Sequence, residues 1–184
     1  MKKILAFGAS NSKTSINKAL ATFAANQLQN VEVRVADLND YASPLYSVDL
    51  QKEEGIDKNV LRFYDLIKSS DAIIISVAEY NGLHTSAFKN LWDWLSRIPM
   101  SKPFNIWDNK PMFLLSASPS RRTMNNVLKV SKQLFPHFGA NIIADFYLPS
   151  FNHFFREGQI IETSYQLGFE EQKNRFQRYL DNME

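Results

Sequence analysis

The pattern of apolar and polar positions predicts strands that alternate with helices along the whole chain. Residues 73–77 and 111–117 form unbroken apolar runs, which are typical of strands buried on both faces of a parallel sheet. Residues 3–7 indicate another central strand. In residues 31–36 Val alternates with charged residues, which indicates a strand nearer the sheet edge. Residues 141–148 supply the last predicted strand.

Between these strands, apolar residues recur at the spacing of amphipathic helices. The predicted stripes are Ile16, Leu20, Phe23, Ala24 and Leu28; Ile56, Val60, Tyr64 and Ile67; Phe88, Leu91, Trp92 and Leu95; Met124, Val127, Leu128, Ser131, Leu134 and Phe135; and Tyr165, Phe169, Phe176, Leu180 and Met183. Thr85 or Ser86 is expected to cap the third helix. Pro136 and Gly139 are expected to end the fourth.

The alternation of strands and helices predicts one α/β domain over residues 1–184. Five strands and about five helices fit a flavodoxin-like three-layer sandwich, with a parallel sheet in the order 2-1-3-4-5. Ligands of such sheets bind at the carboxyl ends of the strands, in the crevice between the first and third. The turns after residues 7 and 77 should therefore meet, and the loop after Ala117 should form a third wall.

Three segments lack a helical or strand period. Residues 37–55 and 98–110 are predicted to be long irregular connections. Residues 151–155 contain three Phe residues in a predicted loop. This loop has three possible roles: it covers a ligand, it packs against a neighbouring subunit, or it belongs to the core.

Composition narrows the class of protein. The formal net charge is +2 and the basic residues are dispersed, so we expect no nucleic-acid partner. The chain has no cysteine, which excludes disulfides, thiolate nucleophiles and thiolate metal sites. The first apolar run stops at Gly8, too early for a membrane-spanning helix. We therefore expect a cytoplasmic protein with no membrane partner, whose redox chemistry would need a bound cofactor.

The turn after residue 7 is rich in hydroxyl groups and leads into a predicted helix. A helix amino terminus presents free N–H groups and partial positive charge, which favour an anion such as phosphate. The hydroxyl and amide side chains there are Ser10, Ser12, Thr14, Ser15 and Asn17. The turn has neither a P-loop ending nor a GxGxxG fingerprint. A capped helix with no ligand is the alternative.

The turn after residue 77 places Tyr80 beside Asn81 and Gly82. A flat aromatic wall with a few polar groups suits a planar heterocycle, although the turn taken alone favours a Tyr that simply packs on the sheet edge. Glu79 is either a general acid or a solvated, hydrogen-bonding carboxylate.

Residues 9–17 resemble the GSxRxxSxN phosphate loop of the NADPH-dependent FMN reductase family. Residues 78–82 resemble the family's PEYNG loop, and Lys89-Asn90 with Asp93-Trp94 resemble its KNxxDW helix. Three positions depart from the pattern, because Ala9 replaces Gly, Ser12 replaces Arg and Ala78 replaces Pro. A lost Arg–phosphate contact is worth about 1.5–3 kcal/mol. Lys13 offers a less directional charge, so the resemblance implies weaker FMN binding.

The resemblance implies an FMN-dependent oxidoreductase. Hydride would pass from NADPH or NADH to FMN, and electrons would then pass to a small acceptor such as a quinone, azo compound or flavin. Ser10, Ser12, Ser15 and Asn17 would hold the phosphate; Glu79, Tyr80, Asn81 and Gly82 would border the ring system; Ser116 and Ser118 would lie near its pyrimidine edge; and Ile16 and Ala78 would complete the loops. No catalytic side chain is implied, and a homodimer or tetramer is expected. A non-catalytic electron carrier is the main alternative, and loss of flavin binding is a third.

Further hypotheses concern the histidines, the pair Arg121 and Arg122, and the tryptophans. The three histidines show no metal-ligand spacing, so no metal site is expected. His84 is interpreted as a solvated loop residue or a contact of flavin or substrate. Arg121 and Arg122 open a predicted helix against its dipole, which favours an anionic partner, although an ordinary exposed pair is the simpler interpretation. The tryptophans form either a dimer surface or part of an aromatic core.

Overall fold

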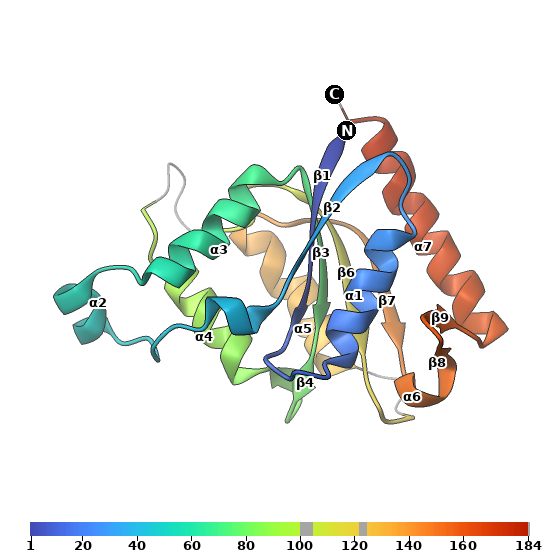
Figure 1. The fold of residues 1–184 in the computed structure, drawn as a ribbon, viewed down its shortest axis with the longest axis horizontal. Helices are drawn as coiled ribbons and strands as arrows, with labels where there is room; N and C mark the ends of the chain where they lie inside the picture. The colour runs from blue at the N-terminus through green and yellow to red at the C-terminus, as the bar shows by residue number, and fades with distance from the viewer. Residues whose placement is uncertain (100–104, 122–124, 184) are drawn as a thin grey trace.

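The computed structural model describes residues 1–99, 105–121 and 125–183. Its central sheet is parallel, with the strand order β2-β1-β3-β6-β7. These strands are β1 (Lys2–Ala9), β2 (Val31–Ala36), β3 (Ala72–Val77), β6 (Pro111–Ala117) and β7 (Asn141–Leu148). The flavodoxin-like order predicted from the sequence, 2-1-3-4-5, is confirmed (Figure 1).

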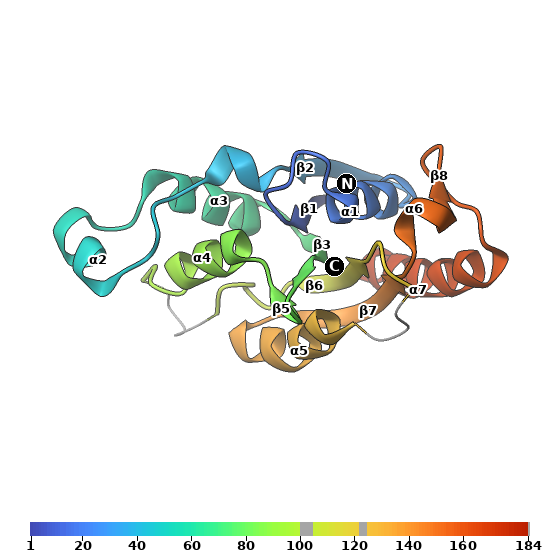
Figure 2. The ribbon, with the colours of Figure 1, turned by 90° about the horizontal axis from the view of Figure 1, so that it is seen from below.

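Helices cover both faces of the sheet, as Figures 1 and 2 show. On one face lie α1 (Ile16–Asn26) and α7 (Thr163–Asp181), and on the other α3 (Lys58–Ser69), α4 (Ser86–Leu95) and α5 (Asn126–Leu134). Side chains of β1 alternate between the two cores, with Leu5 and Phe7 in one, and Ile4 and Ala6 in the other. Burial on both faces explains the absence of apolar–polar alternation in the central strands.

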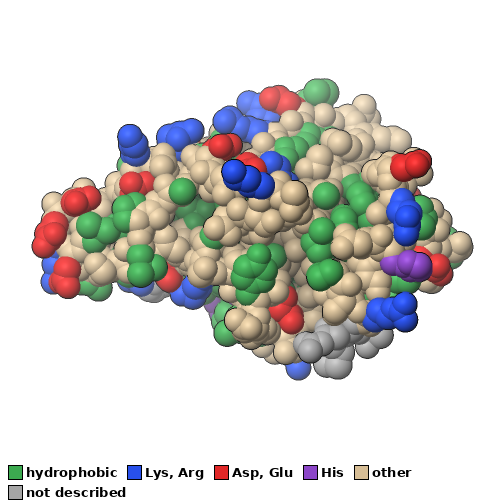
Figure 3. All heavy atoms as spheres, turned by 60° about the horizontal axis from the view of Figure 1, so that its bottom comes forward, with side chains coloured by type: hydrophobic (Ala, Val, Ile, Leu, Met, Phe, Trp, Pro, Cys, Tyr) green, Lys and Arg blue, Asp and Glu red, His purple; other side chains and the backbone are tan. Residues whose placement is uncertain are grey.

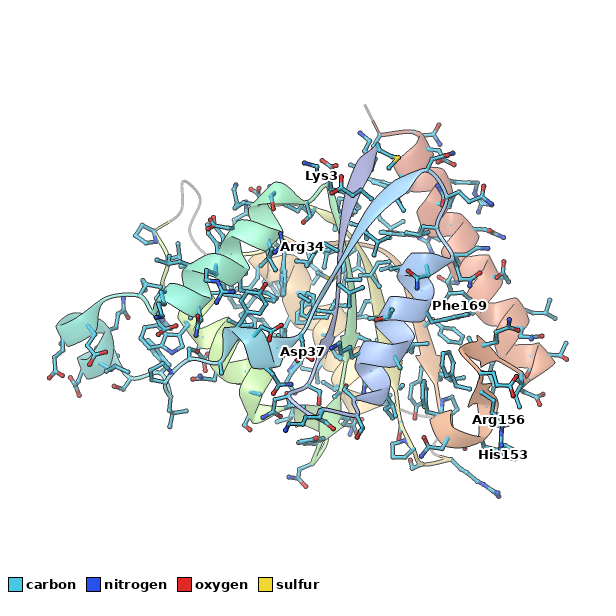
Figure 4. All side chains as sticks on the ribbon, viewed as in Figure 1. Lys3, Arg34, Asp37, His153, Arg156 and Phe169 are labelled. Atoms are coloured by element: carbon cyan, nitrogen blue, oxygen red, sulfur yellow. The ribbon has the colours of Figure 1, made fainter. Side chains whose placement is uncertain are left out.

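Aromatic rings tie the helices to the sheet. Phe7 of β1 meets Phe63 of α3 edge-on, with ring centroids 5.1 Å apart. On the other face Phe169 of α7 stacks on Phe113 and contacts Phe23 of α1, with centroids 6.0 and 4.9 Å away. Figure 4 shows Phe169 directed inward from α7. Such geometries are worth about 0.5–1.5 kcal/mol each beyond the area they bury.

All three tryptophans belong to the core. Trp92, Trp94 and Trp107 are at most 5% exposed, so the hypothesis of a tryptophan dimer surface is wrong. Trp94 lies outside the apolar stripe of α4, and its indole N–H donates to the Pro44 carbonyl at 2.8 Å. Tyr46 covers the same indole, with ring centroids 5.1 Å apart. The connection before α3 therefore covers a face of α4 that lies outside the apolar stripe of this helix.

That connection is not wholly irregular, contrary to the prediction. It contains the 3₁₀ helix η1 (Leu38–Tyr41), capped by Asp37, and helix α2 (Val48–Glu54), capped by Ser47. No residue of α2 is buried, so its sequence shows no apolar stripe. Helix α2 projects from the body of the molecule (Figures 1 and 2).

Residues 151–155 were predicted as a loop, which is also wrong. They form the short helix α6 (Phe151–Phe154) and lead into a hairpin of β8 (Phe155–Arg156) and β9 (Gln159–Ile160). Phe151 is 6% exposed and stacks on Phe155, with centroids 4.6 Å apart. Core packing is therefore the role that the structure gives to Phe151.

The predicted connection 98–110 is described only in part. Ile106 and Trp107 are buried, and residues 105–110 form turns without a helix or strand. Met124, predicted on the fourth helical stripe, and Arg122 lie outside the described residues.

Surface charge is mixed. Figure 3 shows Lys and Arg side chains interspersed with Asp and Glu across the face that it presents, without a continuous basic stripe. Among the helices that the structure describes, none has the length and apolarity needed to cross a bilayer.

Candidate functional site

The loops after β1 and β3 meet, as predicted. The two strands are neighbours, and Ala9 at the end of β1 is paired with Val77 at the end of β3. A cavity of about 210 Å³ lies at these strand ends. Its lining residues are Ser10, Ser12, Thr14, Ser15, Ile16, Asn17, Ala78, Glu79, Tyr80, Ala117, Ser118 and Pro119. Residues from all three predicted loops therefore surround one cavity.

Gly8 allows the start of α1 to approach the sheet this closely. A Cβ atom at Gly8 would lie 2.3 Å from the Lys18 nitrogen and 2.6 Å from its Cα. These neighbours are backbone atoms of α1, so they cannot move aside as a flexible side chain would. A residue without a side chain is therefore needed where β1 leads into the cavity.

The start of α1 presents polar groups to the cavity. Ser15 is the N-cap, and its Oγ accepts a hydrogen bond from the Lys18 N–H at 3.1 Å. The backbone N–H groups of Ile16 and Asn17 follow the cap in the first turn of α1. N–H groups in the first turn of a helix have no carbonyl acceptor within the helix. Ser10 Oγ accepts from the Ser12 N–H at 3.2 Å, which shapes the loop. This arrangement suits an anion.

Two lysines belong to this region and differ in availability. Lys18 forms an ion pair with Asp37 at the end of β2, labelled in Figure 4. The hydrogen bond from Lys18 is the main cause that lowers the pKa of Asp37. Lys13 is exposed, and no ion pair joins it to another residue in the described part of the chain. Of these two lysines, Lys13 is therefore the one available to an anion.

Asn17 is nearly fully buried and ties the loops together. Its Nδ2 donates to the Ala117 carbonyl at 3.2 Å, and its Oδ1 accepts from the Ala117 N–H at 2.8 Å. The Ser76 hydroxyl donates to the same Oδ1 at 2.7 Å. The structure thus gives the Asn17 side chain a role in joining the start of α1 to β3 and β6. Direct contact with a phosphate stays a prediction.

Two residues that sequence reasoning did not assign to the site also hold it. Thr85, the N-cap of α4, donates from Oγ1 to the Ala9 carbonyl at 3.0 Å. Ser76 supports Asn17 from within β3. Both are buried hydroxyl groups, and a buried hydroxyl needs a hydrogen-bond partner. An isolated Ser inside the apolar run of residues 73–77 was the available signal.

Ser116 and Ser118 differ in position. Ser116 is fully buried and donates to the Val77 carbonyl at 2.6 Å, behind the cavity wall. Ser118 lines the cavity, and its Oγ accepts from the Ser120 N–H at 3.1 Å. Ser116 therefore helps to hold β3 against β6, and Ser118 is the residue of this pair that lines the cavity.

The second loop is a tight hairpin. Strands β4 (Glu79–Tyr80) and β5 (Leu83–His84) pair antiparallel. Asn81 and Gly82 have φ angles of +53° and +83°, as a type I′ turn requires. Asn81 and Gly82 are thus at the hairpin tip, outside the cavity lining, and Tyr80 is 52% exposed. The Asn-Gly pair was a signal for this hairpin that the prediction of a simple turn did not use.

Glu79 has a structural partner. Its Oε2 accepts a hydrogen bond from the Val127 N–H at 2.9 Å, in the first turn of α5. A carboxylate is favoured at a helix amino terminus. Of the two interpretations of Glu79, the structure therefore supports the hydrogen-bonding carboxylate.

His84 is not a solvated loop residue, contrary to the prediction. Its ring stacks on Phe135, with centroids 5.7 Å apart, and its Nε2 lies 2.8 Å from the Ser131 hydroxyl. Ser131 in turn donates to the Val127 carbonyl at 2.7 Å. Burial, and secondarily the charge of Lys89, lowers the pKa of His84 to about 4. The imidazole is therefore neutral near pH 7 and anchors the hairpin to α5.

Arg121 lies before helix α5 and not in its first turn. Helix α5 begins at Asn126 with Asn125 as its cap, so Arg121 precedes the helix and its predicted conflict with the dipole does not arise.

Tyr147 of β7 was missed by the sequence reasoning. Burial raises the pKa of Tyr147, although hydrogen bonds with Ser118 and Asn125 oppose this. In the parts of the chain described here, no three metal-ligating side chains gather.

The fold and this site define a flavodoxin-like α/β protein whose strand ends surround a cavity lined by hydroxyl groups. The chain belongs to the NADPH-dependent FMN reductase family, whose model matches residues 2–153. The family that the sequence motifs indicated is therefore confirmed.

Individual relatives match parts of the chain. The quinone reductase of Escherichia coli strain K12 is 41% identical over 56 residues, which are 30% of each protein. An NAD(P)H-dependent FMN reductase of Pseudomonas aeruginosa is 32% identical over 120 residues, 65% of this chain and 61% of that protein. The matches thus span less than two thirds of these curated relatives.

Solved structures share the whole fold. FerB from Paracoccus denitrificans, a flavoenzyme NAD(P)H:acceptor oxidoreductase, has a TM-score of 0.79 and 21% identity, with 98% of both chains covered. An FMN-dependent NADH-azoreductase from Bacillus anthracis, solved in complex with FMN, has a TM-score of 0.60 and 15% identity, covering 97% of this chain and 99% of that one. At these identities the likeness concerns the fold.

Proposed function

We propose that this protein is an FMN-dependent NAD(P)H oxidoreductase. The observation that carries the proposal is the cavity in which the amino terminus of α1, the Asn-Gly hairpin and the loop after β6 converge. Serine hydroxyls and free amide groups at α1 fit a phosphate. Tyr80, half-exposed on the hairpin, fits the flank of a flat ring system.

The residues of the site orient and support the cofactor. Bound FMN supplies the capacity to accept a hydride and pass electrons onward. The Ser15 cap and the Ile16 and Asn17 amides would hold the phosphate end. Glu79 and His84 hold the hairpin against α5 through Val127 and Ser131. No side chain is needed as a nucleophile, which agrees with a chain that has no cysteine.

NADPH or NADH is the proposed hydride donor, and a quinone or similar small molecule the proposed acceptor. The names of the relatives support this choice, because they include an NAD(P)H-dependent FMN reductase and a quinone reductase. The test is to mix FMN-loaded protein anaerobically with each nicotinamide and then add a quinone. We expect the visible flavin absorbance to bleach and then to return. Protein that retains FMN but never bleaches would exclude the proposal.

A non-catalytic electron carrier is the second candidate. The feature that favours it is the projecting helix α2, which carries Asp49, Glu53 and Glu54 against a single basic residue, Lys52, and so offers a small acidic surface to a protein partner. The mixed charge of the face in Figure 3 gives this candidate no broader support. Retained FMN without bleaching by either nicotinamide is the result that this candidate predicts.

We also propose that two copies of the chain associate. The support is an apolar groove of about 490 Å³ between α4 and α5, with Leu83 and Leu134 at its edge, 56% and 40% exposed. Light scattering should give a dimer mass, and Leu134→Asp should reduce it to a monomer. Leu167→Asp, at a site 68% exposed on α7, serves as the control. A monomeric wild-type protein would contradict this proposal, and a tetramer would extend it.

A further inference from the structure

A second cavity adjoins the proposed phosphate site. It has a volume of about 670 Å³ and runs between α1 and the segment formed by α6 and the β8–β9 hairpin. Figures 1 and 2 both show these elements side by side. Its lining residues are Lys13, Thr14, Ser15, Ile16, Lys18, Ala19, Thr22, Phe23, Asn26, Gln27, Phe151, Phe155 and Gly158. We call it the α1 groove.

The α1 groove shares part of its lining with the cavity at the strand ends. Thr14, Ser15 and Ile16 line both. From these residues the groove follows α1 to Asn26 and Gln27 at its far end, a path of roughly 15 Å at 1.5 Å per helical residue. Its volume falls in the range of sites for small molecules. A ligand whose phosphate rests at the start of α1 can therefore extend along the helix from that phosphate.

One wall of the α1 groove is aromatic. Phe155 is half-buried and stacks on Phe151 at an interplanar angle of 20°. Phe23 meets the Phe155 ring edge-on, with centroids 5.4 Å apart. A ring held on two sides keeps its orientation, and stacking on a nucleobase is commonly worth about 1–3 kcal/mol. This wall suits a purine.

The polar groups of the α1 groove are placed for the rest of a nucleotide. Lys13 lines the groove next to Thr14 and Ser15, which border the proposed phosphate position, and has no ion pair among the described residues. Lys18 is engaged by Asp37. Thr22, Asn26 and Gln27 offer hydroxyl and amide groups further along. His153 and Arg156 point outward from this segment (Figure 4) and do not line the groove.

We propose that the α1 groove binds the adenosine monophosphate half of FAD, so that the site accepts FAD as well as FMN. The flavin and its first phosphate would occupy the cavity at the strand ends, which rests on the function proposed above. The second phosphate would lie near Lys13, and the adenine would stack against Phe155. FMN alone would leave this groove empty, and the adenosine monophosphate half of FAD would occupy it.

The test compares the affinities of FMN and FAD in variants that change only the groove. Thr22 lies midway along it, and Thr22→Trp should fill the path of the adenosine. We expect wild-type protein to bind FAD several-fold more tightly than FMN in fluorescence titrations. Thr22→Trp should weaken FAD at least tenfold and change FMN less than twofold. Thr22→Ala, which keeps the groove open, is the matched control.

Phe155→Ala provides a second variant, because it removes the stacking wall without filling the groove. It should weaken FAD about tenfold and leave FMN unchanged, and circular dichroism would verify its fold. Wild-type protein that binds FMN but binds FAD tenfold more weakly would overturn the inference and leave the proposed function intact. Failure to bind either flavin would overturn the proposed function itself.

A nicotinamide nucleotide is a competing occupant of the α1 groove. If its adenosine bound there, Thr22→Trp would raise the KM for NADPH in FMN-loaded enzyme and leave the affinity for FAD unchanged. That pattern would overturn the assignment to FAD. An unchanged KM, together with a weakened affinity for FAD, is the result we expect.

Discussion

The side-chain amide of Asn17 hydrogen-bonds both backbone groups of Ala117, a residue 100 positions further along the chain. Ser76 completes the arrangement by donating to the same Asn17 oxygen. One buried side chain thus fixes the relative positions of the turns at which β1, β3 and β6 end. The geometry of the proposed flavin site depends on this side chain.

Asn17→Ala should therefore lower both stability and flavin affinity. The Ala117 N–H and the Ser76 hydroxyl would lose their buried partner, and each unsatisfied group costs about 1–3 kcal/mol. We expect the free energy of unfolding to fall by about 3 kcal/mol in denaturant titrations. Asn174→Ala, at an exposed position of α7, should change it by less than about 0.5 kcal/mol. Equal losses in both variants would refute the role of Asn17.

Gly8→Ala should displace the start of α1 and so disrupt the proposed site. The added methyl group would meet backbone atoms of α1 at 2.3–2.8 Å, and over-packing of this kind commonly costs about 1–3 kcal/mol or more. Gly168→Ala is the matched control, because its Cβ would lie 3.8 Å from Phe146 inside α7. That change should stabilise the helix by about 0.5–1 kcal/mol. Thermal unfolding of the two variants should therefore shift in opposite directions.

Ser15→Ala should weaken FMN retention about tenfold. It removes the N-cap of α1, worth about 1 kcal/mol, and a hydroxyl facing the proposed phosphate. His153→Ala, at an exposed residue of α6, should leave retention unchanged. Dialysis followed by a visible spectrum measures both. Equal retention in the two variants would contradict the placement of the phosphate.

Asn81→Ala should also weaken FMN retention, through the backbone. Asn81 has a φ of +53°, a conformation that costs Ala roughly 1 kcal/mol more. The hairpin that carries Tyr80 should therefore become less ordered. Asn81→Gly is the control, since Gly accepts this conformation. Recovery of affinity in Asn81→Gly, measured by titration with FMN, would separate the turn from the side chain.

The pH dependence of the free energy of unfolding should reflect the protonation of His84. Its pKa in the folded protein is about 4, against 6.5 for the free side chain, so between these values the unfolded chain binds more protons. Stability is then fully present above about pH 6.5 and falls as the pH drops towards 4. We expect a loss of about 1–2 kcal/mol between pH 7 and pH 5 from this group. His84→Gln should flatten the profile, whereas His153→Gln should retain the wild-type slope.

The fold was predictable because its signals are local. Unbroken apolar runs at residues 73–77 and 111–117 indicated doubly covered strands, and both became fully buried strands. The helices that pack on the sheet carried clear stripes. Helix α2 was not predicted, because it buries no residue and its sequence therefore carries no apolar stripe.

The site was predictable in its loops but not in its contacts. Residues of the turns after β1, β3 and β6 do line one cavity, since strand order brings those turns together. The burial of Ser116, the helix-capping role of Glu79 and the neutral state of His84 depend on what packs against each residue. No spacing along the chain records these neighbours.

The sequence by itself thus determined the order of strands and helices, the sheet type and the turns that form the site, because backbone propensity and burial pattern act over short stretches. Only the tertiary structure decided how polar side chains are used. Asn17 was expected at a phosphate, and its amide is bonded to a strand 100 residues away. The physical reason is that a buried polar group takes whatever partner the assembled core presents, and that partner is defined only after distant elements have packed.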